Sequence, residues 1–151
     1  MKTFAAAALA ALIAAPSLAE GVKIGEVTIE KAWSRATPKG AEVGVAFLTI
    51  RNAGAADKLV SMRCTCSTAV EVHEMSMTNG IMKMRELPKG LDVPAKGEVK
   101  LSPQGIHLML MGLKTPLVKG QTISLDLEFV VSGIVHVDAP VEALGASVPS
   151  Q

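Results

Sequence analysis

Residues 70–112 read VEVHEMSMTNGIMKMRELPKGLDVPAKGEVKLSPQGIHLMLMG and carry the strongest pattern in the chain. Asn79-Gly80 lies between two alternating runs, and this dipeptide favours a two-residue turn in which both residues adopt positive φ. The turn predicts a β-hairpin in which Thr78 faces Ile81. The register of both flanking strands follows from that closing pair.

One face of the predicted hairpin collects sulfur and imidazole side chains. Side chains alternate between the two faces of a strand, so one face holds His73, Met75, Met77, Met82, Met84 and Glu86. The register pairs Met77 with Met82, Met75 with Met84, and His73 with Glu86. His73 and Met84 become diagonal neighbours, about 7–8 Å apart at the backbone.

A second strand, residues 106–111, repeats the combination. His107, Met109 and Met111 share one face, and the first two lie about 6.5–7 Å apart at the backbone. Thioether sulfur is a soft neutral ligand that selects Cu(I), and imidazole also suits copper. The alternative interpretation is that the methionines fill the core, where Met is adaptable. The shared faces favour a soft-metal site.

The spacing of these residues resembles the PCu(A)C family of copper chaperones. That family's pattern is a His, ten residues, a Met, about twenty-one residues and His-x-Met. Here ten residues separate His73 from Met84, and twenty-two separate Met84 from His107. The extra residue is expected in the turn Pro88-Lys89-Gly90. Three further segments carry the resemblance: AWSRA (32–36), LTIRNAG (48–54) and DKLV (57–60).

The resemblance implies a periplasmic chaperone that carries Cu(I), with Cu(II) as an additional form. His73 and Met84 would supply one pair of ligands, and His107 and Met109 the other. The remaining methionines would shield the ion or serve as alternate donors: Met75, Met77, Met82 and Met111. The resemblance also implies delivery to the copper centres of a respiratory terminal oxidase, with a thioredoxin-like protein as a further partner.

Cys64-Thr65-Cys66 is open to three interpretations. The pair could be an accessory thiol site for copper or for thiol exchange, a buried reduced pair, or a tight disulfide. On an extended strand the two Cα atoms would lie near 6.5–7 Å, at the edge of the range for a disulfide. The family pattern does not need these cysteines, so they stay outside the primary site.

Residues 1–19 have the features of a secretory signal peptide, with Lys2, an apolar run and small residues before a cleavage site after Ala19. Cleavage would leave 151 − 19 = 132 residues starting at Glu20. Loss of Lys2 leaves 15 − 1 = 14 basic residues against 14 acidic ones. This balance argues against a nucleic-acid partner and against a polybasic membrane segment.

The mature chain suits one all-β domain, residues 20–142, followed by a flexible tail, 143–151. Eight or nine short antiparallel strands predict a Greek-key sandwich or barrel, and the resemblance implies a cupredoxin-like form. Strands are expected in or near 22–33, 43–52, 59–62, 90–94, 97–101, 121–131 and 134–137, besides the hairpin and 106–111. Trp33 is expected to anchor the core, and His136 to lie on the surface.

Other functions remain open beside a monomeric chaperone. A copper-buffering protein would have the same site without a dedicated acceptor, and a thiol-based metal or redox module would use Cys64 and Cys66. An enzyme is disfavoured, because Glu86 is the lone candidate base. An electron-transfer copper site would need a cysteine beside His107. A purely adhesive sandwich would bind no copper.

Overall fold

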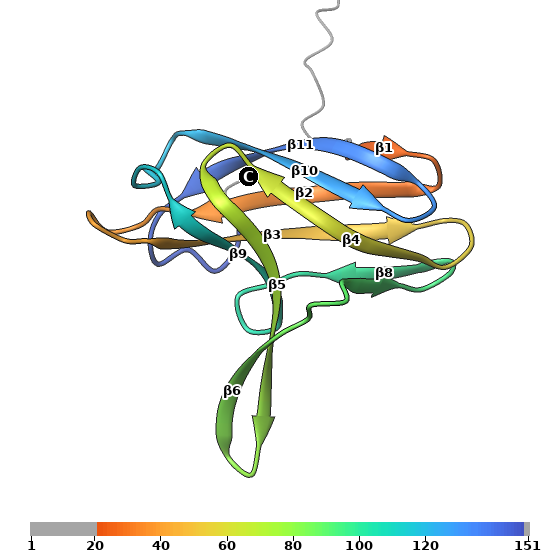
Figure 1. The fold of residues 1–151 in the computed structure, drawn as a ribbon, viewed down its shortest axis with the longest axis horizontal. Coiled ribbons are helices and arrows are strands. Elements are labelled where there is room, and N and C mark those ends of the chain that lie inside the picture. Colours follow the sequence, from red (N-terminus) through yellow and green to blue (C-terminus); the bar gives the residue numbers. More distant parts are fainter. Residues whose placement is uncertain (1–20, 150–151) are drawn as a thin grey trace, which may run out of the picture.

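The computed structural model describes residues 21–149, which contain eleven β-strands and no helix (Figure 1). The strands are β1 (Val22–Ile24), β2 (Val27–Arg35), β3 (Val43–Asn52), β4 (Asp57–Cys64), β5 (Ser67–Thr78), β6 (Ile81–Glu86), β7 (Leu91–Val93), β8 (Gly97–Lys100), β9 (Ile106–Leu113), β10 (Thr122–Phe129) and β11 (Gly133–Glu142). No helix that could span a membrane occurs in this range. The expected signal peptide and its cleavage site after Ala19 lie outside the described residues.

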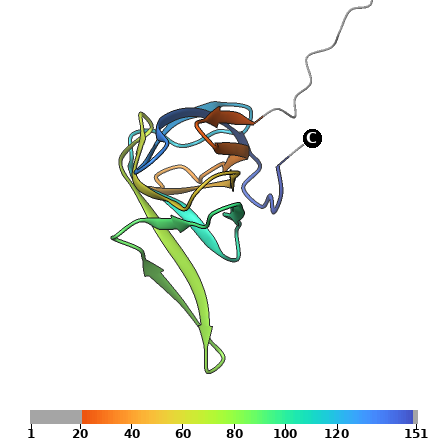
Figure 2. The same ribbon diagram turned by 90° about the vertical axis from the view of Figure 1, so that its right-hand side faces the viewer.

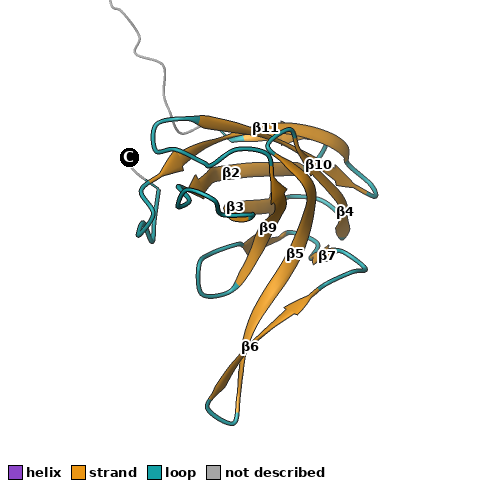
Figure 3. Cartoon of the chain, turned by 60° about the vertical axis from the view of Figure 1, so that its left-hand side comes forward, coloured by secondary structure: helices purple, strands orange, loops and turns teal. Residues whose placement is uncertain are grey.

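The strands form two sheets that roll around one core (Figure 3). The larger sheet has the order β6-β5-β9-β3-β2, with β1 added to β2 and β8 added to β3. The smaller sheet has the order β11-β10-β4-β7. β11 joins the two sheets, because its last residues pair in parallel with β2 through Val141 and Ser34. The predicted all-β architecture is confirmed.

The core lies between the inward faces of the two sheets. Alternation along β5 and β9 sends Val70, Val72, Leu108 and Leu110 inward, and β10 contributes Leu125 and Leu127 from the other side. Five of these six side chains are at most 1% exposed. The site residues of β5 and β9 alternate with them and therefore lie on the outward face of the larger sheet.

Three strand predictions need correction. The region 22–33 is two strands, because Gly25 turns the chain at φ 55°. The last strand runs from Gly133 to Glu142, well beyond the expected 134–137, since it pairs first with β10 and then with β2. Eleven strands result instead of eight or nine, and the β2–β11 pair is parallel.

Trp33 is buried as predicted, but it lies outside the main core. Its ring packs on Phe47 with centroids 4.6 Å apart, on the face of the larger sheet opposite the core residues Ala46 and Leu48. The guanidinium of Arg35 covers the rings of both Trp33 and Phe47, and it lies 5.9 Å from the Trp33 centroid. Arg35 Nε also donates to Ala146 O at 2.6 Å, so it binds the strandless C-terminal segment to the barrel.

β5 carries the chain from the barrel into a projecting hairpin arm, residues 75–86 (Figure 2). Its first part pairs with β9, whereas beyond Glu74 its strand partner is β6. Asn79 and Gly80 have φ values of 51° and 75°, as a type I′ turn requires. Thr78 faces Ile81, and every predicted pair of the hairpin is present.

Candidate metal centre

Two histidines from neighbouring strands face each other on the outward side of the larger sheet. His73 of β5 lies opposite His107 of β9, and their ring centroids are 6.1 Å apart. His107 is only 5% exposed, and the side chain of His73 is 14% exposed. The fold therefore brings together the two histidines that the sequence places on separate strands.

Each ring is held by a hydrogen bond that decides where its proton lies. In His107, Nδ1 is 3.0 Å from Gly105 O; because a carbonyl only accepts, Nδ1 donates and Nε2 of the neutral ring keeps a lone pair. In His73, Nε2 is 2.8 Å from Oε2 of Glu71. An ionised Glu71 accepts the Nε2 proton, so the lone pair of His73 lies on Nδ1.

His73 Nδ1 is available for a ligand. Among residues 21–149, it is the only buried side-chain nitrogen or oxygen without a hydrogen-bond partner. Buried polar atoms are normally paired, so an unpaired one calls for an explanation. Glu71 is a site residue that the sequence analysis did not identify, since it considered only Glu86 on the face of His73. The available signal was Glu-x-His, a spacing that places both side chains on one face of a strand.

Met84 and Met109 flank the histidine pair from opposite directions. Side chains that lie opposite one another across the strands form a row, and successive rows on one face are two residues apart. Met109 lies opposite Glu71, in the row next to that of His107 on the side away from the arm. Met84 lies in β6, one row toward the tip of the arm, and is 52% exposed. Each row is about 7 Å from the histidine row at the backbone, within reach of long side chains.

The other methionines lie at greater or different distances. Met75 shares the row of Met84. Met77 and Met82 form the next row, about 14 Å from the histidines at the backbone. Met111 lies about 14 Å away in the opposite direction along β9. In this register, only Met75 of these four is placed to approach an ion between the histidines.

The donor set restricts the metal. Within the described residues, no three or more His, Cys, Asp or Glu side chains are grouped so that they could hold a metal ion. The thioethers of Met84 and Met109, one step along the strands from the histidine pair, could complete the coordination of an ion held there. Zinc sites use thiolate or carboxylate beside imidazole, whereas thioethers suit Cu(I). The arrangement fits a soft monovalent ion best.

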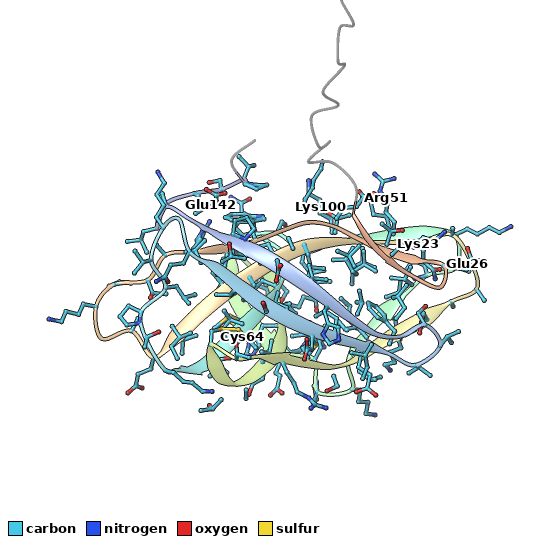
Figure 4. All side chains as sticks on the ribbon, turned by 90° about the horizontal axis from the view of Figure 1, so that it is seen from above. Lys23, Glu26, Arg51, Cys64, Lys100 and Glu142 are labelled. Atoms are coloured by element: carbon cyan, nitrogen blue, oxygen red, sulfur yellow. A yellow bond between two sulfur atoms is a disulfide. The ribbon has the colours of Figure 1, made fainter. Side chains whose placement is uncertain are left out.

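Cys64 and Cys66 form a disulfide, with Cα atoms 5.1 Å apart (Figure 4). The spacing of 6.5–7 Å expected for an extended strand is wrong, because β4 ends at Cys64 and the next two residues turn into β5. Both sulfurs are engaged, so neither supplies a thiolate in this state. His73 lies about 20 Å farther along β5, and the disulfide does not join the histidine site.

His136 lies on the surface of the smaller sheet, as predicted. Its side chain is 79% exposed, and Nδ1 is 2.5 Å from Oδ1 of Asp126 in the paired strand. Together with Arg63 and Glu128 it lines a shallow groove. This groove belongs to a different sheet from the histidine pair and shares no residue with it.

Comparison with known families gives a match across both sheets. A family model described as "Putative lipoprotein LpqE-like" matches residues 27–141. A protein of Leifsonia xyli subsp. xyli, described as "Putative lipoprotein Lxx21020", is 34% identical over 123 residues. The aligned region is 81% of this chain and 73% of that protein. The family match runs from β2 into β11 and includes the hairpin arm.

Solved structures with the same fold include PCuAC domains. The apo PCuAC domain from PmoF1 has a TM-score of 0.69 at 24% identity, covering 82% of this chain and 98% of that domain. The copper-bound PCuAC domain from PmoF2 has a TM-score of 0.69 at 22% identity, covering 82% and 97%. The solution structure of CuI-DR1885 from Deinococcus radiodurans has a TM-score of 0.59 at 28% identity, covering 81% and 80%. The predicted cupredoxin-like barrel is confirmed.

Proposed function

The chain belongs to the LpqE-like family, and from this premise we propose that it is a non-catalytic Cu(I) chaperone. The observation that carries the proposal is the facing pair His73 and His107, in which each ring directs one nitrogen to a fixed partner and keeps a lone pair on the other. Met84 and Met109 would complete the coordination. Among solved structures that share the fold, the copper-bound PCuAC domain supports copper as the ion, and CuI-DR1885 supports Cu(I).

The proposed ligands suit a carrier because all four are neutral. Imidazoles that already have a free lone pair and thioethers that never carry a proton can exchange at Cu(I) without releasing protons. His107 is buried, whereas Met84 is 52% exposed. A partner protein would therefore reach the ion from the side of Met84, while His107 holds it from within the sheet.

We place the protein outside the cytoplasm, in the periplasm. The Cys64–Cys66 disulfide supports an oxidising compartment. The lipoprotein descriptions of the matching family and of the Leifsonia xyli relative support an envelope location. In such a compartment, a copper site without thiols has the advantage that its ligands are not lost to disulfide formation.

We infer that the protein acts as a monomer and delivers Cu(I) to a respiratory oxidase. The acceptor would be a copper centre of the oxidase or a thioredoxin-like intermediary, as the resemblance to PCu(A)C chaperones implies. A transfer assay with purified acceptor separates this role from copper buffering. If the protein is a chaperone, the acceptor gains Cu(I) faster from the loaded protein than from a Cu(I)–chelator complex. If it is a buffer, its presence slows the transfer of Cu(I) to the acceptor.

The test of copper binding is an anaerobic Cu(I) titration against a chromophoric chelator. We expect tight binding of a first ion, and a loss of affinity of about 100-fold in His107→Ala and about 10-fold or more in Met84→Leu. His136→Ala is the matched control, since its ring is exposed on the other sheet. Cys64→Ser/Cys66→Ser should also retain the first ion.

Two results would overturn the proposal. One is full Cu(I) affinity in the His107→Ala variant. The other is a loss of binding that follows the cysteine variant, which would instead identify a thiol-based module.

A further inference from the structure

The hairpin arm exposes apolar side chains that contribute nothing to the core. Every residue from Ser76 to Glu86 is exposed, and the arm extends away from the barrel in both views (Figures 1 and 2). Met77, Met82 and Met84 are 65%, 51% and 52% exposed. Core packing, the usual reason for methionine, does not explain these residues.

The four methionines of the arm share one face and stand in two cross-strand pairs. Met77 lies opposite Met82, and Met75 lies opposite Met84. The arm's opposite face is mostly polar and includes the ion pair of Glu74 and Arg85, whose Nη2 and Oε2 are 2.7 Å apart. The segregation places sulfur on one side only, which is the side of the histidine pair.

The turn places both methionine pairs where cross-strand side chains come closest. Thr78 and Ile81 close the turn and form the hydrogen-bonded pair. Pairs alternate along an antiparallel ladder, so the two methionine rows are non-hydrogen-bonded, with Cα atoms about 4.5 Å apart. The rows themselves are about 7 Å apart along the strands. Four flexible thioethers at these separations can converge on one ion.

We propose that Met75, Met77, Met82 and Met84 form an outer Cu(I) site that loads and unloads the histidine site. The proposal rests on the proposed function, because it requires that the inner site holds Cu(I). Met84 belongs to both sites, so an ion can pass inward by exchanging one ligand at a time. Copper remains Cu(I) throughout, and each exchange replaces one neutral donor with another, so no electron or proton moves.

An ion moving from the tip of the arm to the histidine site would pass three successive rows of side chains. An ion would arrive at Met77 and Met82 near the tip, pass to Met75 and Met84, and reach the histidine row, with steps of about 7 Å at the backbone. Exposure decreases along this route, from 65% at Met77 to 5% at His107. A partner can therefore deliver Cu(I) to the tip without entering the buried part of the site.

The experiment uses the full chain with ¹³C-methyl methionine and follows the methyl signals during an anaerobic Cu(I) titration. The test variant is Met77→Leu/Met82→Leu, which keeps the apolar surface and removes the sulfur. Met62→Leu in β4 is the matched control. In the unmodified chain, we expect the second equivalent of Cu(I) to shift the Met77 and Met82 signals, and the test variant to bind only one equivalent.

A kinetic experiment follows Cu(I) uptake from a chelator by stopped flow. We expect the test variant to take up its single ion about tenfold more slowly, with the affinity of that ion within about twofold of the unmodified chain. A second variant, His107→Ala, should still show the Met77 and Met82 shifts, since the outer site does not use that ring.

The outcomes separate this proposal from the function on which it rests. If the first equivalent binds at the histidines and no Cu(I) shifts Met77 or Met82, the outer site is refuted and the chaperone function stands. Unchanged uptake by the leucine variant refutes the proposal that the outer site loads the histidine site. If no methionine signal moves at any concentration, both proposals fail.

Discussion

At the scale of single residues, Glu71 selects the nitrogen that His73 offers to a metal. Its Oε2 lies 2.8 Å from Nε2, and a hydrogen-bonded carboxylate of this kind fixes both the tautomer and the ring orientation of a ligating histidine. We predict that Glu71→Ala shifts the neutral His73 ring toward the tautomer protonated at Nδ1. Long-range ¹H–¹⁵N spectra of the metal-free protein measure this directly.

Glu71→Gln is the conservative comparison for that variant. Its amide oxygen can accept the same Nε2 proton, so the tautomer should stay as in the unmodified chain. Cu(I) affinity should fall by about 10-fold in the alanine variant and much less in the glutamine variant. Equal His73 spectra in all three proteins would show that Glu71 has no positioning role.

At the scale of one element, the arm depends on its turn more than on packing. Gly80 has a φ of 75°, and a Cβ at this position would meet nothing within 4 Å. Gly80→Ala should therefore cost about 1 kcal/mol through backbone conformation alone. Because the arm buries no core, we expect faster amide exchange in β6 and an unfolding midpoint that changes by at most a few degrees.

Gly40→Ala provides the matched control, since Gly40 also has positive φ and open space around a new Cβ. It lies in the loop before β3, away from the arm. It should leave β6 exchange unchanged. Accelerated β6 exchange in both variants would point to a global loss of stability instead of a local one.

The same element shows which features a sequence can predict. The register inside the arm follows from Asn79-Gly80, because a two-residue turn leaves a single way to align the strands. The pairing of His73 with His107 has no such local cause; it depends on β5 and β9 meeting across the intervening residues, and only the complete sheet order specifies it. The turn between Cys64 and Cys66 has no comparable signal, because an extended strand through Thr65 is equally compatible with the sequence.

At the scale of the whole molecule, a buried carboxylate connects stability to pH. Asp57 is 8% exposed, and it accepts hydrogen bonds from the backbone of Val131 at 2.8 Å and from the backbone and hydroxyl of Ser132 at 3.0 and 2.7 Å. Burial raises the pKa of Asp57, but these hydrogen bonds, together with one from the backbone of Lys58, outweigh burial, and its pKa lies below the ordinary 3.8.

Because the pKa of Asp57 is lower in the folded than in the unfolded state, the ionised carboxylate stabilises the fold at pH values above its unfolded-state pKa. This stabilisation is lost as the pH falls through its folded-state pKa. We predict that the free energy of unfolding of Asp57→Asn depends less on pH below about pH 4 than that of the unmodified chain. Asp57→Ala should destabilise the fold by about 2–4 kcal/mol at pH 7, since it leaves buried N–H groups unpaired. Chemical denaturation at several pH values measures both. Asp92→Asn, at a carboxylate whose side chain is 91% exposed, is the control.

The parallel contact between β11 and β2 has a consequence for how the chain folds. Val141 pairs with Ser34, so 141 − 34 = 107 positions separate partners that must meet before the barrel closes. Contacts of such long range slow folding. During synthesis, the end of β2 at Ser34 and Arg35 lacks its β11 partner until Val141 and Glu142 have emerged, and open strand edges favour pairing with other chains. This end of β2 is therefore the part of the barrel that stays exposed to other chains for the longest time during synthesis.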